Sequence, residues 1–257
     1  KVHDVQEDPS IFPPMTLEES MELTKVYSIL GILDDKSPLI RRRPFRSVHH
    51  TATKTALVGG GMVPVPGEIS LAHQGVLFLD ELPEFQKNVL EVLRQPLEDH
   101  QVRITRNQGN YLFPANFMLV AAMNPCPCGC YPDMNRCTCT PGQIQHYLGK
   151  LSQPFLDRMD ICVEAPRVQY EALQKGHKEE SSASIRERVC RAREIQNMRY
   201  KGTTSLTNAM LGTRELEMYC TLGGQEEKLM RQAFARLGLT ARTYHKILKV
   251  ARTIADL

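Results

Sequence analysis

The sequence has no apolar run of about 18 residues, and this absence excludes a membrane-spanning helix. Its first residues show no signal-peptide pattern, and no internal repeat or low-complexity segment is visible. The excess of positive over negative charge is also small: the net charge of +3 does not by itself argue for a nucleic-acid partner. With 42% apolar and 24% charged residues, the 257-residue chain is typical of a soluble globular protein of one large or two modest domains.

A complete phosphate-binding loop is missing as well. The pattern Gly-x-x-x-x-Gly-Lys-Ser/Thr occurs nowhere, because Lys54 and Thr55 lack the preceding glycines and the glycines at residues 59–61 lack a following lysine. The chain therefore does not carry the usual cradle for nucleotide phosphates.

The cysteines are not spread as in a disulfide framework. Of the eight, five lie within residues 126–139, whereas Cys162, Cys190 and Cys220 are scattered. This distribution fits a metal site in a reduced, cytoplasmic protein better than it fits secretion. Four thiolates around Zn²⁺ make a closed structural site, although the spacing here is Cys-x-Cys twice rather than the usual Cys-x-x-Cys. A loop of free thiols and disulfides formed after purification are the alternatives.

The chain is organised around residues 76–79, four large apolar residues that lead into Asp80 and Glu81. This run predicts a strand buried on both faces in a parallel sheet. Carboxylates at the carboxyl end of such a strand point into the crevice where these sheets bind ligands. Asp80 is then placed to hold Mg²⁺ and Glu81 to activate a water, as in phosphoryl transfer. The alternative is a core strand that ends in a solvated Asp-Glu turn.

Upstream of this strand the sequence predicts one helix and one irregular stretch. Thr16 and Glu19 form a capping box for a helix from Leu17 to about Gly31. Its apolar positions are Leu17, Met21, Leu23, Val26, Tyr27 and Leu30. Residues 41–68 are rich in glycine and proline, which favours a mobile loop or insertion over a core element.

Downstream, a helical pattern runs from Phe85 to Leu93, and residues 101–113 predict a β-hairpin with Arg103 and Arg106 near its tip. Residues 117–122 predict a second buried strand, which ends close to Asn124. An apolar strand is predicted at residues 161–163.

After Pro166 the character becomes helical, and we expect the domain boundary at 166–180. Helices are predicted over about 185–200 after a serine cap, at Thr213, between residues 224 and 238, and after Thr240. The apolar side of the last helix comprises Tyr244, Ile247, Leu248, Val250 and Ile254.

This ordered series resembles the AAA+ ATPases of the helix-2-insert, pre-sensor-1-hairpin branch, and more closely the magnesium-chelatase-like competence protein ComM group. Residues 44–51, 56–61, 66–73 and 124–129 are similar to that group's motifs, and the resemblance covers nearly the whole chain. It implies an α/β fold: a truncated P-loop core with a parallel sheet at residues 1–170, followed by an all-helical lid domain at 171–257 that is incomplete at its C-terminus. It also implies ATP and Mg²⁺ as cofactors.

The resemblance implies roles for three more residues. Asn124 matches sensor 1, which helps to position the attacking water, although asparagine at a strand end is otherwise a turn former. Arg158 matches the arginine finger that reaches the neighbouring subunit's nucleotide; the alternative is an ion pair with Asp157 or Asp160. Arg242 matches sensor 2 in the lid, unless it is a solvated arginine. The resemblance also favours Cys126, Cys128, Cys137 and Cys139 as zinc ligands and leaves Cys130 spare.

The missing phosphate loop departs from the family, where it lies upstream of the helix that begins at Leu17. We therefore expect a fragment with the hydrolytic half of an ATPase site, inactive alone. The resemblance implies a hexameric motor acting on DNA, with a branch-migration role in transformation or recombination, in which Arg103 and Arg106 hold phosphates. The alternatives are a chelatase-type subunit that remodels a protein partner and a catalytically silent zinc-bearing interaction module. For the arginines, the alternative is a solubilising role.

Overall fold

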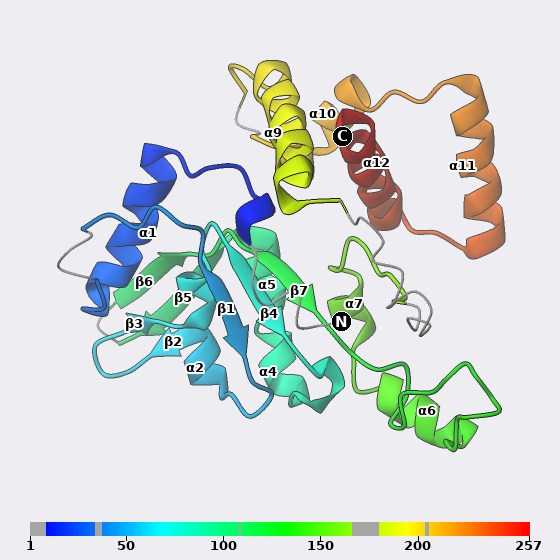
Figure 1. The fold of residues 1–257 in the computed structure, drawn as a ribbon, viewed down its shortest axis with the longest axis horizontal. Helices are drawn as coiled ribbons and strands as arrows, with labels where there is room; N and C mark the ends of the chain where they lie inside the picture. Colours follow the sequence, from blue (N-terminus) through cyan, green and yellow to red (C-terminus); the bar gives the residue numbers. More distant parts are fainter. Residues whose placement is uncertain (1–8, 34–37, 108, 166–179, 204–205) are drawn as a thin grey trace. The chain divides into compact units, whose positions relative to one another are not determined.

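The computed structural model describes residues 9–33, 38–107, 109–165, 180–203 and 206–257. The chain forms two compact units, one comprising Pro14–Met159 and the other Asp160–Leu257 with the short segment Ser10–Pro13 (Figure 1). The predicted boundary at residues 170 and 171 lies outside the described residues. An α/β unit followed in sequence by an all-helical unit confirms the predicted fold class. Among the described residues, no helix is long and apolar enough to span a membrane.

Three parallel strands form the sheet of the first unit, in the order β1-β4-β7. The central strand, β4 (Val76–Leu79), is buried along its whole length, as its apolar run predicts. The strands β1 (Phe45–Val48) and β7 (Met118–Ala121) flank it. Because all three strands are parallel, their carboxyl ends meet at one edge of the sheet, which is where such sheets bind ligands.

The expectation of a mobile loop over residues 41–68 is wrong for much of that stretch. Its strand β1 pairs with β4 along its whole length, from Phe45 beside Val76 to Val48 beside Leu79. The helix α2 (Lys54–Val58) follows and buries Leu57 completely. The glycines and prolines gather further on, so the average composition of the stretch concealed a short strand whose partner lies about thirty residues away in sequence.

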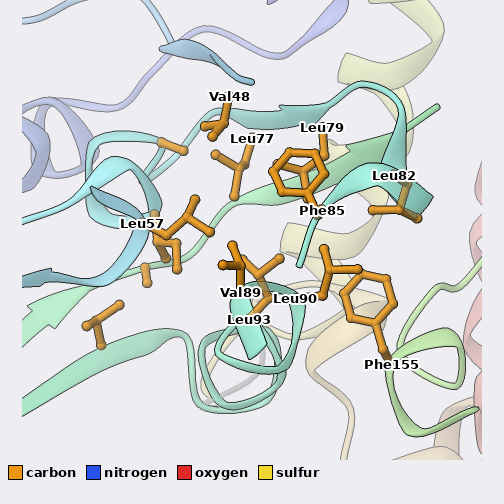
Figure 2. Close-up of a cluster of buried hydrophobic side chains, with 14 of the residues drawn as sticks. Val48, Leu57, Leu77, Leu79, Leu82, Phe85, Val89, Leu90, Leu93 and Phe155 are labelled. Atoms are coloured by element: carbon orange, nitrogen blue, oxygen red, sulfur yellow. The ribbon is translucent and has the colours of Figure 1, made fainter. Parts of the chain in front are cut away.

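One cluster of apolar side chains forms the core of this unit (Figure 2). Figure 2 shows Val89, Leu90 and Leu93, from α4 (Lys87–Glu91) and the turn after it, gathered beneath Leu77 and Leu79 of β4. Fully burying one such side chain stabilises the fold by about 1.5–3 kcal/mol. This packed core therefore supports β4, whose end lies at the carboxyl edge of the sheet.

The predicted capping box at the start of α1 (Leu17–Ile29) is confirmed: the Thr16 side chain accepts the N–H of Glu19, and the Glu19 side chain accepts the N–H of Thr16. Leu23 and Val26 are buried as predicted, but Leu17 and Met21 are exposed. The buried face of the helix is therefore narrower than its apolar pattern. It also includes a polar residue, Ser20, which donates a hydrogen bond to the carbonyl of Ile40.

A buried histidine ties α1 to the sheet. The His73 side chain follows α3 (Glu68–Leu71), is 3% exposed, and accepts the N–H of Asn116 on Nδ1 at 3.1 Å. Its Nε2 therefore carries the proton of the neutral ring, and this atom lies 3.2 Å from a Glu22 carboxylate oxygen. Burial lowers the pKa of His73 below its ordinary value, although Glu22 opposes the shift.

This histidine predicts a pH dependence of stability. Because its folded-state pKa is lowered, the stabilisation is fully present above the ordinary histidine pKa of about 6.5 and is lost as the pH falls through the folded-state value. We expect the free energy of unfolding to fall by at most about 1.4 kcal/mol per pH unit through this group, and the component to vanish in His73→Gln. Denaturant unfolding at pH values above and below the ordinary histidine pKa measures this pH dependence of the free energy of unfolding. The exposed His146 gives the control, His146→Gln, and an unchanged pH slope in His73→Gln would contradict the prediction.

The predicted hairpin is confirmed. Strands β5 (Gln101–Arg106) and β6 (Gly109–Pro114) pair antiparallel, with Arg103 beside Leu112 and Arg106 beside Gly109. Residue 108 of the predicted turn lies outside the described residues. A smaller hairpin joins β2 (Gly59–Gly60) to β3 (Val65–Pro66).

Two strand predictions need correction. Residues 161–163 form no strand, and Ile161 and Val163 are exposed. An apolar sequence becomes a strand only where a neighbour completes its hydrogen bonds, and no described strand pairs with these residues. The strand at 117–122 exists as β7, but it is only partly buried because, among the described residues, β4 is its one partner.

Short helices complete the first unit. They are η3 (Leu82–Glu84), α5 (Arg94–Asp99), α6 (Pro141–Leu148) and α7 (Gln153–Leu156). A further short helix, η2 (Pro9–Ile11), precedes this unit in sequence, and its residues Ser10 and Ile11 belong to the second unit. Thr140 and Gln143 form a second capping box at the start of α6.

The second unit is helical, as predicted. It comprises α9 (Ser182–Arg199), η4 (Asn208–Met210), α10 (Thr213–Tyr219), α11 (Gly224–Leu237) and α12 (Ala241–Asp256). The predicted caps at Ser181 and Thr240 are confirmed, whereas Gly212 rather than Thr213 caps α10. On α12 the apolar assignment is wrong for Ile254, which is 65% exposed.

A buried ion pair joins the two ends of this unit. The Asp256 carboxylate accepts two hydrogen bonds from Arg199 of α9, at 2.6 and 2.8 Å, and one from Asn208 at 2.9 Å. Burial alone would raise the pKa of Asp256, but these bonds hold it below its ordinary value. A hydrogen-bonded pair of this kind fixes how α12 packs on α9.

Candidate active site

The carboxylates predicted to act on a metal and a water lie at the carboxyl end of β4. Asp80 is half-buried, and one of its carboxylate oxygens accepts the N–H of Glu81 at 2.9 Å. The Glu81 side chain is 59% exposed. The buried strand therefore delivers two oxygen ligands to solvent at the edge of the sheet.

The backbone of Glu81 is strained. Its φ of 52° and ψ of 46° place a non-glycine residue in the left-handed region, which ordinary residues rarely adopt. The conformation is held from both sides, because the N–H of Leu82 donates to the carbonyl of Ala122 at 3.0 Å and the N–H of Ala122 donates to the carbonyl of Leu79 at 2.9 Å. Strain of this kind clusters at functional sites, where the surrounding structure imposes it.

A histidine from the neighbouring strand contacts Glu81. The parallel register places Val48 beside Leu79, so two residues further His50 falls beside Glu81. Its Nδ1 lies 3.3 Å from a Glu81 carboxylate oxygen. Its ring packs edge-on against Phe85 and lies tilted against the ring of His49. No local pattern in the sequence predicts a role for His50. The only signal was that it lies in a segment similar to the ComM group's motifs.

Asn124 lies at the same edge, three residues after β7. Glu81 and Asn124 line one open cleft of about 1020 Å³. Its other lining residues include Glu84, Gln143, Tyr147 and Lys150. The structure thus brings together two residues that lie more than forty positions apart, and the cleft is wide enough for a ligand of nucleotide size.

The cleft also contains a cation, Lys150, that no sequence motif marks. The Lys150 ammonium lies 3.3 Å from the Glu84 carboxylate and 5.5 Å from the centre of the Tyr147 ring. Burial raises the pKa of Tyr147 above its ordinary value. This part of the cleft lining therefore combines an ion pair with an aromatic ring.

Arg158 is held by its own chain. Its guanidinium lies 2.7 Å from the Glu98 carboxylate and donates to the carbonyl oxygens of Arg94, at 3.2 Å, and Pro154. Only 10% of the side chain is exposed. The ion pair that the sequence offered as the alternative exists, but with Glu98 of α5 rather than with Asp157 or Asp160.

Arg242 belongs to the second unit, in the first turn of α12, where its residue is exposed. Its predicted role as sensor 2 stays a prediction.

Both hairpin arginines are exposed, but they lie on opposite faces of the ribbon. Side chains alternate along a strand, so Arg103 is on the outer face beside Leu112, whereas Arg106 shares the parity of the buried Val102 and Ile104. At the end of the strand Arg106 turns toward the smaller hairpin, where a Cβ atom added to Gly60 would lie 3.5 Å from its guanidinium. The two hairpins are therefore neighbours.

The four cysteines selected by the resemblance converge. The sulfur atoms of Cys126, Cys128, Cys137 and Cys139 all lie within 4.8 Å of one another. Cys130 is outside this group, and its thiol is directed at the carbonyl of Cys128. Backbone N–H groups of Thr138 and Cys130 lower the pKa of Cys128 to about 5. All four thiols are free.

Two protein-family models match the chain. The model described as magnesium chelatase, subunit ChlI, matches residues 5–173, and the model described as magnesium chelatase, subunit ChlI C-terminal, matches residues 179–257.

Curated relatives match nearly the whole chain. Competence protein ComM of Haemophilus influenzae is 47% identical over 249 residues, which are 96% of this chain and 48% of that protein. The protein YifB of Salmonella typhimurium is 45% identical over 248 residues, with the same coverage of 96% and 48%. The chain therefore spans about half the length of the curated relatives it matches.

Proposed function

Because the chain belongs to the magnesium chelatase subunit ChlI family of AAA+ ATPases, we propose that it supplies the metal-holding and water-activating side chains of an ATP hydrolysis site. The observation that carries this proposal is the cleft at the carboxyl edge of the sheet, which Glu81 and Asn124 line together. Asp80 lies at the same strand end.

The residues at this edge fit a hard divalent cation. Mg²⁺ prefers oxygen ligands and keeps several waters, and Asp80 offers a half-buried carboxylate at the mouth of the sheet. When bound, Mg²⁺ neutralises the charge that develops on transferred phosphate oxygens. Asp80 would hold it, while the N–H of Glu81 fixes the orientation of the Asp80 carboxylate.

Glu81 is proposed to orient the attacking water and accept its proton. Its strained backbone directs the carboxylate outward, and His50, 3.3 Å away, limits the directions in which that carboxylate can turn. Asn124 presents an amide from the segment just after β7, where it can hold the same water. Glu81 is therefore the base, and His50 and Asn124 are positioning groups.

The site is half of a complete one. The sequence contains no phosphate-binding loop, so the glycine-rich loop and its lysine would come from a segment that this chain does not contain. We use "full-length protein" for this chain together with that segment. Without positioned phosphates, Asp80 and Glu81 have nothing to act on, and the chain alone would hydrolyse ATP negligibly.

We propose that the full-length protein acts on DNA as an assembly of copies. The support is the resemblance to the ComM group and the pair of neighbouring hairpins, of which one carries Arg103 and Arg106. Exposed arginines contact phosphates without reading sequence. Because these two lie on opposite faces of the ribbon, they would contact different phosphates rather than clamp one.

The hairpin arginines give the test of the DNA proposal. Changing Arg103 and Arg106 together to alanine in the full-length protein should weaken binding equally for unrelated sequences and reduce the slope of log affinity against log salt by about 2. Each single change should give about half of that reduction in slope. Fluorescence anisotropy with labelled DNA across a salt series measures both. Arg231→Ala, an 80% exposed arginine of α11, is the control, and an unchanged slope in the double variant would return both arginines to a solubilising role.

The family models' description favours a second candidate, a chelatase-type subunit whose ATPase remodels a protein partner. The two candidates differ in what they bind. Stable capture of a larger chelatase subunit, without salt-dependent DNA affinity, would select the second.

A further inference from the structure

The four converging cysteines are not part of the hydrolytic chemistry, and their geometry is that of a ligand shell. The sulfur of Cys126 lies 3.4 Å from that of Cys128 and 3.8 Å from that of Cys137, and Cys128 and Cys137 are 3.7 Å apart. A tetrahedral zinc ion with Zn–S bonds of about 2.3 Å places its sulfur ligands about 3.8 Å apart. The observed separations match one ion at the centre of the group.

The surrounding backbone also supports the interpretation of these cysteines as a ligand shell. The N–H of Tyr131 points at the Cys126 sulfur at 3.4 Å, and Cys126 itself is completely buried. A turn closed by the N–H of Cys137 donating to the carbonyl of Asp133 at 2.8 Å returns the chain to the first pair of cysteines. Four sulfur atoms packed this closely repel one another as thiolates, and a bound dication removes that repulsion.

The loop that carries these cysteines, residues 126–139, also contacts the candidate active site. Cys126 follows Asn124 by two residues, and a Cβ atom added to Gly129 would lie 3.7 Å from the Asn124 amide oxygen. Gly129 has a φ of +72° and lies between ligand cysteines, so the turn that the cysteines close packs against the Asn124 side chain. Cys128 and Cys139 line the same cleft as Glu81.

From these contacts we infer that Cys126, Cys128, Cys137 and Cys139 bind one structural Zn²⁺, and that this ion holds the Gly129 turn against Asn124 and so sets the geometry of the hydrolytic cleft. All four positions of the ion are filled by sulfur, which leaves no open position for chemistry. The ion acts on hydrolysis only through the position of Asn124. This second part rests on the proposed ATPase function, whereas the metal site does not.

Cys130 provides a matched control, because it lies in the same loop but outside the sulfur group. Elemental analysis of the chain prepared without chelator should find about one zinc per chain in the wild type and in Cys130→Ser, and substantially less in Cys137→Ser. Substitution with Co²⁺ should give the absorption of tetrahedral thiolate coordination in the first two proteins only. If Cys137→Ser fails to fold, removal and return of zinc in the wild-type protein, followed by circular dichroism, makes the same test.

Three results would overturn the metal site: no metal with all five loop thiols reactive in the folded protein, one iron in place of zinc, or equal metal loss in Cys130→Ser. For the link to hydrolysis, Cys137→Ser in the full-length protein should lower kcat by between about tenfold and a hundredfold and leave nucleotide affinity unchanged, while Cys130→Ser keeps both. A metal-free variant with wild-type kcat would overturn the link. An inactive wild-type protein that still contains zinc would instead refute the proposed ATPase function and leave the metal assignment standing.

Discussion

Changing Glu81 to glutamine in the full-length protein is expected to lower the rate of ATP hydrolysis by about 10²–10⁴-fold and to leave nucleotide binding intact. Glutamine has nearly the shape of glutamate, so it can keep the contact with His50 and the strained backbone, but it cannot accept the proton of the attacking water. Phosphate release under steady-state conditions measures the first effect. Titration with a fluorescent nucleotide measures the second.

The chain offers a close control for this change. Glu84 lines the same cleft and pairs with Lys150 at 3.3 Å, but it lies one helical turn beyond the strand end. Glu84→Gln removes the same charge from the same cleft and should retain most of the activity. Loss of nucleotide binding in Glu81→Gln would mean that Glu81 is structural, and robust turnover by the chain alone would refute the half-site proposal.

Arg158→Ala in the full-length protein should lower hydrolysis by about 10³-fold or more if Arg158 reaches the nucleotide of a neighbouring copy. The structure adds a condition that the sequence did not reveal, because Glu98 now holds the guanidinium at 2.7 Å. A finger that acts in another subunit must leave this ion pair or share it. Mixing Arg158→Ala subunits with Glu81→Gln subunits should restore part of the activity, since an intact finger can then meet an intact base.

Glu98 separates this role from a structural one. Glu98→Gln breaks the ion pair but keeps Arg158, so it should retain hydrolysis while costing a similar amount of stability in thermal unfolding. Equal loss of activity in Glu98→Gln and Arg158→Ala, together with no recovery in mixed assemblies of confirmed size, would show that Arg158 only braces α5 against α7.

Local sequence determined the elements whose signals lie within a few residues. The capping boxes at Thr16 and Thr140 and the cap at Thr240 mark their helices because a side chain bonds a backbone group three positions away. The Thr140 box has the same local signal, a Thr-x-x-Gln pattern directly before the helix. The alternation of the hairpin and the four apolar residues of β4 are equally local.

Strands whose partners are distant were harder to predict. β1 was obscured by the glycines and prolines that follow it, and it exists because β4 completes its hydrogen bonds. Residues 161–163 are more apolar than β1, yet no described strand lies beside them, and they form no strand and stay exposed. Composition decides whether a segment can become a strand, and pairing decides whether it does.

The residues able to carry the chemistry are visible in the amino-acid sequence: two carboxylates after a buried strand, an asparagine after another, and a set of cysteines. Which of these residues meet depends on how the whole chain folds. The parallel register placed His50 beside Glu81, the fold placed Arg158 beside Glu98 of α5, and the loop after β7 brought four sulfur atoms around one point. These contacts join residues from nine to sixty positions apart. Bringing such distant residues together depends on the packing of the whole core, and no single local motif predicts it.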